Sequence, residues 1–465
     1  MTVSREIASW AEGLTFEALP LEAVSAAKLH LLDTLGAGLA AHARGVATAG
    51  RAVAPAIGGT GPSTVIGSPI GFAPAAAALA NGMLCHGLDF DDTHADSICH
   101  VGVVIVPAAL AVAEASGASG RDLLVALVAG GEITTRVGSA AAPGYMVRGF
   151  HPTSVSGVFG AVVAAATLQR MSADEIGSAL GIAGSMSSGL FAYLGDGAAT
   201  KPVHAGWAAH GGIVAAELAR AGAEGPGPVF EHRFGFFSAF YGLTADAFEA
   251  QVADLGRRWE SPRIAFKPYP VCHFVHACLD AAVQLVAEHP IVPSEIERIV
   301  VAVPDASVPL VLEPLSEKRL PRTEYDAKFS LPYSLAALLL HGRVGVETYT
   351  EDAIGDPGVL ALAARVEHVA RDFPTYPQSF PGWVRIELRS GAAFELELAH
   401  QRGGPENPMT ADDVSAKFRD NASLALDDDA LIRLESAILS LEQHDDLAGC
   451  FAPLRATSTP QPVPR

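Results

Sequence analysis

The chain has 465 residues, which is too long for one simple hydrophobic core and predicts two domains. Its formal net charge of −20 argues against nucleic acid and anionic membranes as partners. An anionic substrate would therefore need a locally positive pocket. Hydrophobic residues make up 49% of the chain and aromatic residues only 7%, so small apolar residues dominate, which is typical of closely packed helices.

The cellular location is predicted from three further features. Five cysteines are scattered without a CxxC pair, which is typical of reduced thiols in a cytosol. Residues 1–19 carry several charges and lack the apolar core of a signal peptide. The longest apolar run, residues 101–113, is too short to cross a membrane and predicts a buried helix. We therefore expect a cytoplasmic protein with no membrane segment.

Residues 1–264 predict a helical domain, because apolar and small residues recur at helical spacing. The motif Ser172-Ala-Asp-Glu175 is a capping box and predicts the start of one helix. Other helices are expected over residues 4–14, 20–41, 74–85, 119–137, 153–169 and 201–221.

The pattern changes after Trp259. Residues 296–303 are rich in β-branched side chains and predict a strand, and residues 383–400 alternate in two halves around Ser390-Gly391, which predicts a hairpin. With helices expected around residues 334–340 and 359–366, a smaller α+β domain should occupy residues 265–401.

Two helices, over residues 410–421 and 427–441, should return to the helical domain, so that residues 402–451 complete it. The proline-rich residues 452–465 predict a disordered tail. The predicted fold class is thus mainly α, with a large helical domain and a smaller α+β domain.

Residues 86–100 are the densest group of titratable side chains, with three histidines and four aspartates in fifteen residues. Apolar, alanine-rich sequence flanks them on both sides. Charged groups that enter a core must be paired, hydrogen-bonded or shifted in pKa. Such groups are candidates for a functional site, although a satisfied, acidic helix junction is the alternative.

Two groups of residues could bind a metal ion. Oxygen and imidazole ligands for a divalent ion, as in a metal-dependent hydrolase, could come from the cluster His86, Asp89, Asp91, Asp92 and His94. Part of a zinc site could come from Cys272, His273 and His276, but a fourth ligand is not evident. Neither spacing is a recognised ligand signature, and no nucleotide-binding glycine motif is present.

Outside that stretch, Lys201 and Lys267 each precede a proline. Lys267 lies in an apolar segment at the predicted domain junction, where clefts commonly form. Positive or proton-transferring groups could also come from Arg148, His151 and His204. For each of these residues alone, a structural role is an equally good interpretation.

Six motifs, taken together and in this order, resemble the MmgE/PrpD family: His86-Gly-Leu-Asp-Phe-Asp-Asp-Thr93, Gly149-Phe-His-Pro-Thr153, Thr200-Lys-Pro-Val-His-Ala-Gly206, Phe266-Lys-Pro-Tyr-Pro270, Phe329-Ser-Leu-Pro-Tyr333 and Asn407-Pro-Met-Thr410. That family includes dehydratases of 2-methylcitrate, decarboxylases of cis-aconitate and epimerases of iminodisuccinate. The resemblance implies a helical domain built from both chain ends, an α+β lid domain, a homodimer, and no metal or organic cofactor.

The resemblance also implies the site. The pocket would contain the catalytic residues Asp89, His100, His151, Lys201, Lys267 and Tyr333. Substrate binding is expected from Thr93, Arg148, His204 and His273.

The predicted function is a metal-independent lyase or isomerase acting on a small di- or tricarboxylate by dehydration, decarboxylation or epimerisation. Lys201 and Lys267 would stabilise charge that develops on a substrate carboxylate. One histidine would act as base, and a second histidine or Tyr333 as acid. The alternatives are the metal-dependent hydrolase and a carboxylate-binding homologue without catalytic activity.

Overall fold

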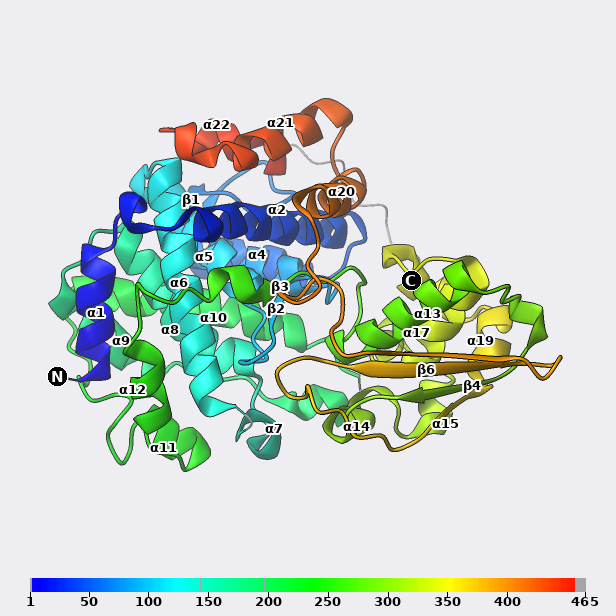
Figure 1. The fold of residues 1–465 in the computed structure, drawn as a ribbon. Helices are drawn as coiled ribbons and strands as arrows, with labels where there is room; N and C mark the ends of the chain where they lie inside the picture. The colour runs from blue at the N-terminus through cyan, green and yellow to red at the C-terminus, as the bar shows by residue number, and fades with distance from the viewer. Residues whose placement is uncertain (1, 143, 196, 456–465) are drawn as a thin grey trace.

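The computed structural model describes residues 2–142, 144–195 and 197–455. The fold is mainly α: helices form the larger part, and a four-stranded sheet lies in the smaller part (Figure 1). Positions 456–465 of the predicted tail lie outside the described residues. Its first residues are ordered, since Ala452–Leu454 form a 3-10 helix and the Leu454 carbonyl accepts a 2.9 Å hydrogen bond from Gly67 N. The prediction of disorder was wrong there, because Leu454 is buried in the core.

The helices predicted in the first 264 residues are present: α1 (Val3–Gly13), α2 (Leu21–Ala43), α4 (Pro74–His86), α5 (Gly102–Ser116), α6 (Gly120–Ala141), α8 (Pro152–Leu168), α9 (Ala173–Gly184) and α10 (Lys201–Arg220). The predicted capping box begins α9, where the Ser172 side chain accepts from Glu175 N. Within the described residues, α6 alone is long and apolar enough to cross a membrane, and 94% of its most apolar window is buried inside the protein.

Small residues bring these helices close together. A Cβ atom added to Gly82 in α4 would lie 2.7 Å from the Cα of Gly206 in α10, so the backbones of the two helices touch. Gly160 in α8 is equally confined, since a Cβ there would lie 2.4 Å from the carbonyl oxygen of Gly130 in α6. The high alanine and glycine content of the sequence is therefore explained by tight helix packing.

One hydrophobic cluster joins residues from both ends of the chain. It contains residues between 3 and 264 and between 418 and 454, with Val346 in addition. The late members come from α20 (Ala411–Ala422), α21 (Asp428–Leu439) and α22 (Leu447–Phe451). In Figure 1 the orange and red helices α20 and α21 lie along the blue helix α2, where the Phe418 ring packs over Gly36.

A second hydrophobic cluster contains residues between 271 and 388. Its sheet has the order β5-β4-β6-β7, with β4 parallel to β5 and antiparallel to β6. The strands are β4 (Ile296–Ala302), β5 (Val366–His368), β6 (Gly382–Leu388) and β7 (Ala393–Leu398). The predicted strand and hairpin are confirmed as β4 and as the β6–β7 pair.

Helix α13 (His276–Glu288) packs against β6 and β7 and was not predicted. Helix α17 (Leu331–His341) matches its prediction, whereas the helix expected over residues 359–366 ends earlier, as α19 (Pro357–Ala363). Val366 instead begins β5, because its backbone pairs with Ile299 in the sheet.

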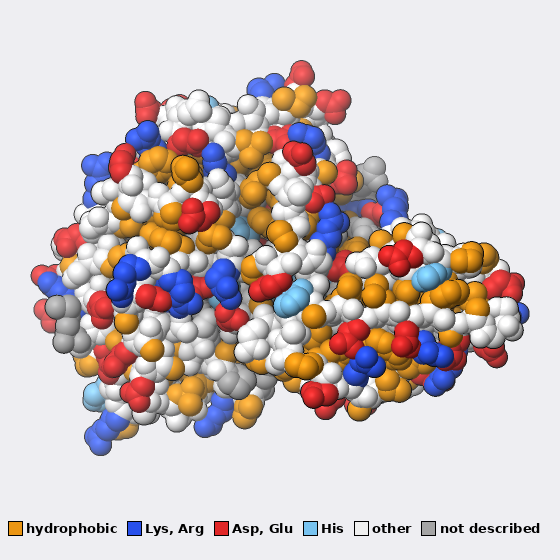
Figure 2. All heavy atoms as spheres, viewed as in Figure 1, with side chains coloured by type: hydrophobic (Ala, Val, Ile, Leu, Met, Phe, Trp, Pro, Cys, Tyr) orange, Lys and Arg blue, Asp and Glu red, His pale blue; other side chains and the backbone are white. Residues whose placement is uncertain are grey.

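The segments that connect the two clusters lie side by side. Phe266 N donates to the Gly403 carbonyl at 3.1 Å, and a Cβ on Gly403 would lie 2.0 Å from the Phe266 carbonyl oxygen. Gly403 also has a φ of +100°, a value that strongly favours glycine. Figure 2 shows an indentation where the larger and smaller parts meet, and acidic and basic side chains interspersed over the face in view.

Candidate active site

The site is organised around Asp89, just beyond the end of α4. Its φ of +54° lies in the left-handed region, which is uncommon for a residue other than glycine. The side chain is fully buried. A few residues later Thr93 and His94 form the short strand β2, which pairs with Ile264–Ala265 (β3), so the loop is joined to the segment that leads to Lys267.

Two lysines share one carboxylate oxygen of Asp89. Lys201 Nζ donates to Oδ1 at 2.6 Å, and Lys267 Nζ donates to the same atom at 3.1 Å. Both lysines are buried, and Lys201 lies at the first position of α10. Burial acts to raise the pKa of Asp89, but the two ammonium groups outweigh it and hold this pKa well below its ordinary value. The site therefore has more cationic than anionic groups around Asp89.

Asp91 contacts two histidines at once. Its Oδ1 lies 2.9 Å from His86 Nδ1, and its Oδ2 lies 2.8 Å from His100 Nδ1. His100 Nδ1 also lies 2.9 Å from the carbonyl oxygen of Asp92. Because both histidines make these contacts through Nδ1, Asp91 does not use their Nε2 atoms. Nε2 of His86 has no hydrogen-bond partner among the described residues. Asp91 thus orients two imidazoles.

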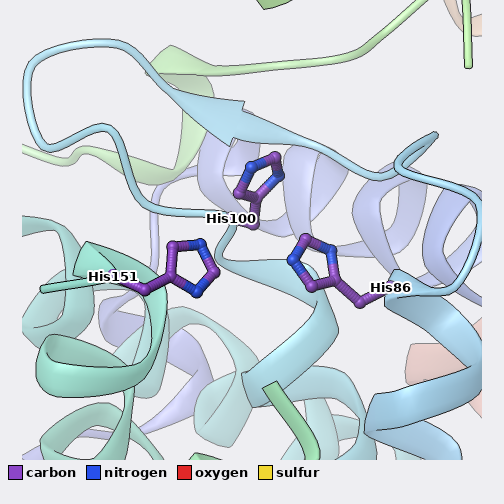
Figure 3. A group of neighbouring side chains, drawn as sticks. All are labelled: His86, His100 and His151. Carbon is purple, nitrogen blue, oxygen red and sulfur yellow. The ribbon is translucent and has the colours of Figure 1, made fainter. Parts of the chain in front are cut away.

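His151 completes a group of three imidazoles, which converge in Figure 3. It is the N-cap of α8, and its ring is stacked on that of His86 with centroids 5.8 Å apart. Its Nδ1 lies 3.1 Å from Nδ1 of His204, which belongs to the first turns of α10. The rings of His86 and His100 come from the two ends of one short stretch, and that of His151 comes from a later segment.

The imidazoles of His100, His151 and His204 are held neutral at pH 7. Burial and the positive charge of Lys201 lower the pKa of His100 to about 4. The same two causes hold the pKa of His151 well below its ordinary value. For His204, burial followed by the charges of His86 and Lys201 lowers the pKa to about 4. Neutral imidazoles beside fixed ammonium groups can accept protons, and an arriving anion would raise their pKa.

A cavity of roughly 50 Å³ lies against these groups. Its wall is formed by Asp89, Thr93, Ile98, His100, Lys201, Lys267, Cys272, His273, Phe274 and Phe380. His273 is buried, and neither of its ring nitrogens has a hydrogen-bond partner in the described part of the chain. Burial also raises the pKa of Cys272, so its thiol stays protonated rather than nucleophilic. The wall is suited to an anionic ligand.

Comparison with known proteins identifies the family. Residues 5–248 match the MmgE/PrpD N-terminal domain, and residues 269–443 match the MmgE/PrpD C-terminal domain. The chain belongs to the MmgE/PrpD family.

Curated members of this family are similar to the chain over nearly its whole length. The cis-aconitate decarboxylase of Homo sapiens is 31% identical over 477 residues, which cover 99% of this chain and 96% of that protein. The cis-aconitate decarboxylase-like protein oryM of Aspergillus oryzae is 29% identical, over 97% of this chain and 96% of that protein. The cis-aconitate decarboxylase of Mus musculus is 30% identical, over 99% and 94%.

The structure brings most of the residues predicted from the MmgE/PrpD motifs into this one place. They are Asp89, Thr93, His100, His151, Lys201, His204, Lys267 and His273. Thr93 Oγ1 lies 3.3 Å from His100 Nδ1, and the backbone N–H of His100 donates to Thr153 Oγ1 at 3.0 Å.

Tyr333 and Arg148 are not brought to the cavity. Tyr333 lies in the core of the second cluster, where its hydroxyl donates to the carbonyls of Thr348 and Ala353 at 2.8 and 3.0 Å. Arg148 is exposed at the end of α7 (Gly144–Arg148). The motif that ends at Tyr333 begins an interior helix, so its tyrosine faces the core and not the cavity.

Three members of the five-residue metal cluster expected from the sequence stay together, because ligand atoms of His86, Asp89 and Asp91 lie with one of His100 within 4.8 Å of one another, whereas Asp92 and His94 do not belong to that group. Asp92 Oδ2 lies 3.0 Å from His30 Nδ1, and His94 Nδ1 lies 2.9 Å from Ser97 Oγ, so both residues have partners elsewhere. Ring nitrogens of His86, His100 and His151 do lie within 4.8 Å of one another, which is close enough to share an ion. Lys201 and Lys267 place positive charge beside them, so Coulomb repulsion favours an anion over a metal cation there.

Two residues near the site, Lys328 and Tyr325, were not predicted from the sequence. Lys328 is buried, and its Nζ donates to the Leu88 carbonyl at 2.6 Å. The Tyr325 hydroxyl is buried without a hydrogen-bond partner among the described residues. Its pKa is raised well above the ordinary value by burial and by the negative charge of Asp89, which places it near the site. The only sign of these two residues in the sequence is that they directly precede the Phe329–Tyr333 motif.

Proposed function

We propose that the protein is a metal-independent lyase that acts on a small tricarboxylate, and that decarboxylation of cis-aconitate is its reaction. The observation that carries the proposal is the buried pair of ammonium groups of Lys201 and Lys267 beside neutral imidazoles. The human and mouse relatives named above are cis-aconitate decarboxylases, which supports this substrate over other carboxylates.

In the proposed complex, substrate carboxylates bind to Lys201 and Lys267 and share these cations with Asp89. Ammonium groups in a water-poor site attract a carboxylate much more strongly than they do in water. The negative charge of the substrate raises the pKa of His100 and His151, so one imidazole takes up a proton when the substrate binds. His100 or His151 therefore becomes protonated only when an anionic substrate is bound.

The reaction then proceeds without an added oxidant or metal. The carbon–carbon bond to one carboxylate breaks, carbon dioxide leaves, and the electron pair spreads over the adjacent double bond toward a remaining carboxylate. The lysine ammonium groups stabilise this developing charge. The imidazolium of His100 or His151 delivers its proton to carbon and becomes neutral again. One proton is consumed for each carbon dioxide released.

We further propose that residues 265–401 form a lid on a helical domain made of residues 1–264 and 402–451. The cavity of roughly 50 Å³ supports this, because pockets that bind small molecules usually measure several hundred Å³. Opening of the lid would admit substrate, and closure would expel water. A homodimer, which the family resemblance implies, and a location in the cytoplasm, which the scattered cysteines favour, are part of the same proposal.

A panel of acids tests the function. Purified protein is incubated with cis-aconitate, citrate, 2-methylcitrate, tartrate and an aminodicarboxylate, and release of carbon dioxide, loss of water and change of stereochemistry are followed separately. Carbon dioxide from cis-aconitate supports the proposal. Water loss or inversion with another acid would assign dehydration or epimerisation instead, and thermal stabilisation by an acid without turnover would indicate a binding protein.

A metal-dependent hydrolase is the second candidate, since two groups of described residues could hold an ion: His86, His100 and His151, and His86, Asp89, Asp91 and His100. Elemental analysis of the purified protein distinguishes the two. A stoichiometric divalent metal, with activity lost on chelation and restored by that metal, would favour the hydrolase.

A further inference from the structure

Three consecutive backbone carbonyls in the Asp89 loop each accept a hydrogen bond from a buried lysine. Leu88 accepts from Lys328 at 2.6 Å, Asp89 from Lys267 at 3.0 Å, and Phe90 from Lys417 at 2.7 Å. The lysines belong to α16 (Glu324–Lys328), to the segment after β3 and to α20. Three distant parts of the chain thus meet at three adjacent peptide groups.

Burying a lysine ammonium group to bind a backbone carbonyl is energetically unfavourable. Lys328 is 4% exposed and Lys417 is 8% exposed, whereas most lysines keep their ammonium group in water. Burial lowers the pKa of both, and that of Lys328 falls to about 8. Lys417 is partly compensated by Asp33, whose Oδ1 lies 2.7 Å from its Nζ. Groups that are expensive to bury are usually retained for a specific purpose.

We propose that Lys328 and Lys417 are positioning residues that hold the carbonyls on either side of Asp89 and so keep Asp89 in its left-handed conformation. In that conformation the Asp89 carboxylate reaches both Lys201 and Lys267. A residue other than glycine is held at positive φ only when its surroundings over-determine it. Lys328 holds the peptide group before Asp89, Lys267 holds the one after it, and Lys417 holds the next one, so three charge-assisted hydrogen bonds in a row supply that restraint.

The two positioning residues connect different parts of the molecule to the loop. Lys417 belongs to a helix of the first hydrophobic cluster, near the end of the chain, and its ammonium also lies 4.0 Å from the Phe90 ring centroid. Lys328 belongs to the unit that contains the sheet and lies 5.6 Å from the Tyr349 ring centroid. The Asp89 conformation therefore depends on the docking of both the C-terminal helices and the sheet-containing unit.

The test replaces each positioning residue by methionine, which has no donor group. Matched controls are Lys28→Met and Lys318→Met, since Lys28 donates to the Leu439 carbonyl at 3.0 Å beside Glu442, and Lys318 to the Leu310 carbonyl at 2.6 Å. Lys417→Met and Lys328→Met should each lower kcat by roughly 100-fold, the loss that a misplacement of about 1 Å produces. Most of the loss should fall on kcat, because Lys201 and Lys267 keep their own backbone positions.

A merely structural role would lower Tm without lowering the kcat of the folded protein. Because Lys417→Met leaves Asp33 unpaired, the double variant Lys417→Met/Asp33→Asn removes both charges together and keeps the test usable if the single variant does not fold. The kcat of this double variant should also fall by roughly 100-fold. A kcat within about twofold of wild type in the folded variants, or an equal loss in the controls, overturns the proposal.

The kinetic test of this inference rests on the proposed function. Crystal structures of the variants provide a second test, which does not require turnover. In these variants the φ angle of Asp89 should become negative, and the distance from its Oδ1 to Lys201 Nζ should increase. Retention of the left-handed conformation with both lysine contacts overturns the inference, whether or not the wild type turns over any acid. Turnover of no acid by the wild type overturns only the proposed function.

Discussion

Nζ of Lys201 lies 2.6 Å from Oδ1 of Asp89, although the two residues are 112 positions apart in the sequence, and both side chains are buried. The cation is thus already paired in the free protein. Because Lys267 shares the same oxygen, one carboxylate serves two ammonium groups. The two ammonium groups therefore carry one more charge than Asp89 alone can balance, and a substrate carboxylate can balance it.

Removal of the Lys267 ammonium should abolish most activity without unfolding the protein. Lys267→Ala leaves Asp89 paired with Lys201, so the fold should persist. We expect kcat/KM to fall by about 10³-fold, equivalent to about 4 kcal/mol of transition-state stabilisation. Lys267→Arg should also be poor, because a planar guanidinium does not replace a compact ammonium. Lys318→Ala is the control, and near wild-type turnover by Lys267→Ala would refute the assigned role.

Binding of a tricarboxylate should be accompanied by proton uptake. In the free protein the pKa of His100 is about 4, so the ring is neutral at pH 7, and a bound anion raises this pKa. Calorimetric titration with cis-aconitate or citrate in buffers of different ionisation enthalpy should report uptake, and affinity should rise as the pH falls from 8 to 6. His100→Gln should reduce the uptake. The same heat in every buffer for the wild type would exclude this coupling.

Stability should fall as the pH drops from about 6.5 to 4. His100 and His204 have an ordinary pKa of 6.5 and a folded pKa of about 4, so the unfolded chain binds more protons in that range. The free energy of unfolding therefore increases with pH there, by up to about 3 kcal/mol for each histidine. Urea unfolding at several pH values measures the slope, and His100→Gln should make it shallower. A flat profile would contradict the neutral state of the imidazoles.

Two tyrosines of the sheet-containing unit should behave differently when their hydroxyl groups are removed. The Tyr333 hydroxyl donates to two carbonyls in the core, so Tyr333→Phe should cost about 1 to 2 kcal/mol of stability and leave kcat nearly unchanged. The Tyr325 hydroxyl is buried near Asp89 without a partner among the described residues, so Tyr325→Phe should lower kcat by at least about tenfold. The reverse pattern would restore Tyr333 as the acid.

Chelation should leave activity intact. Lys201 and Lys267 oppose a metal cation beside the three histidines, so dialysis against EDTA should not change kcat. Added Zn²⁺ should not raise kcat either. A metal-restored activity would instead assign His86, His100 and His151 as ligands.

The strands of the α+β unit could be predicted from sequence, because strict alternation and β-branched runs are local signals. The helices of the first 264 residues could also be predicted, from local spacing and from the capping box at Ser172. Helix α13 was missed, and β5 was taken for the end of a helix, because Val366 becomes a strand only through its pairing with Ile299. Pairing across a sheet is not a local property.

The sequence by itself determined which residue types the site contains, since the motifs around Asp89, His151, Lys201 and Lys267 could be read directly. Only the tertiary structure decided how they are used. It placed both lysines on one oxygen of Asp89 and directed Tyr333 into the core. It also brought Lys328 and Lys417 to the carbonyls beside Asp89. The physical reason is that the lysine contacts join segments more than 100 residues apart, and no local spacing specifies which buried ammonium meets which oxygen.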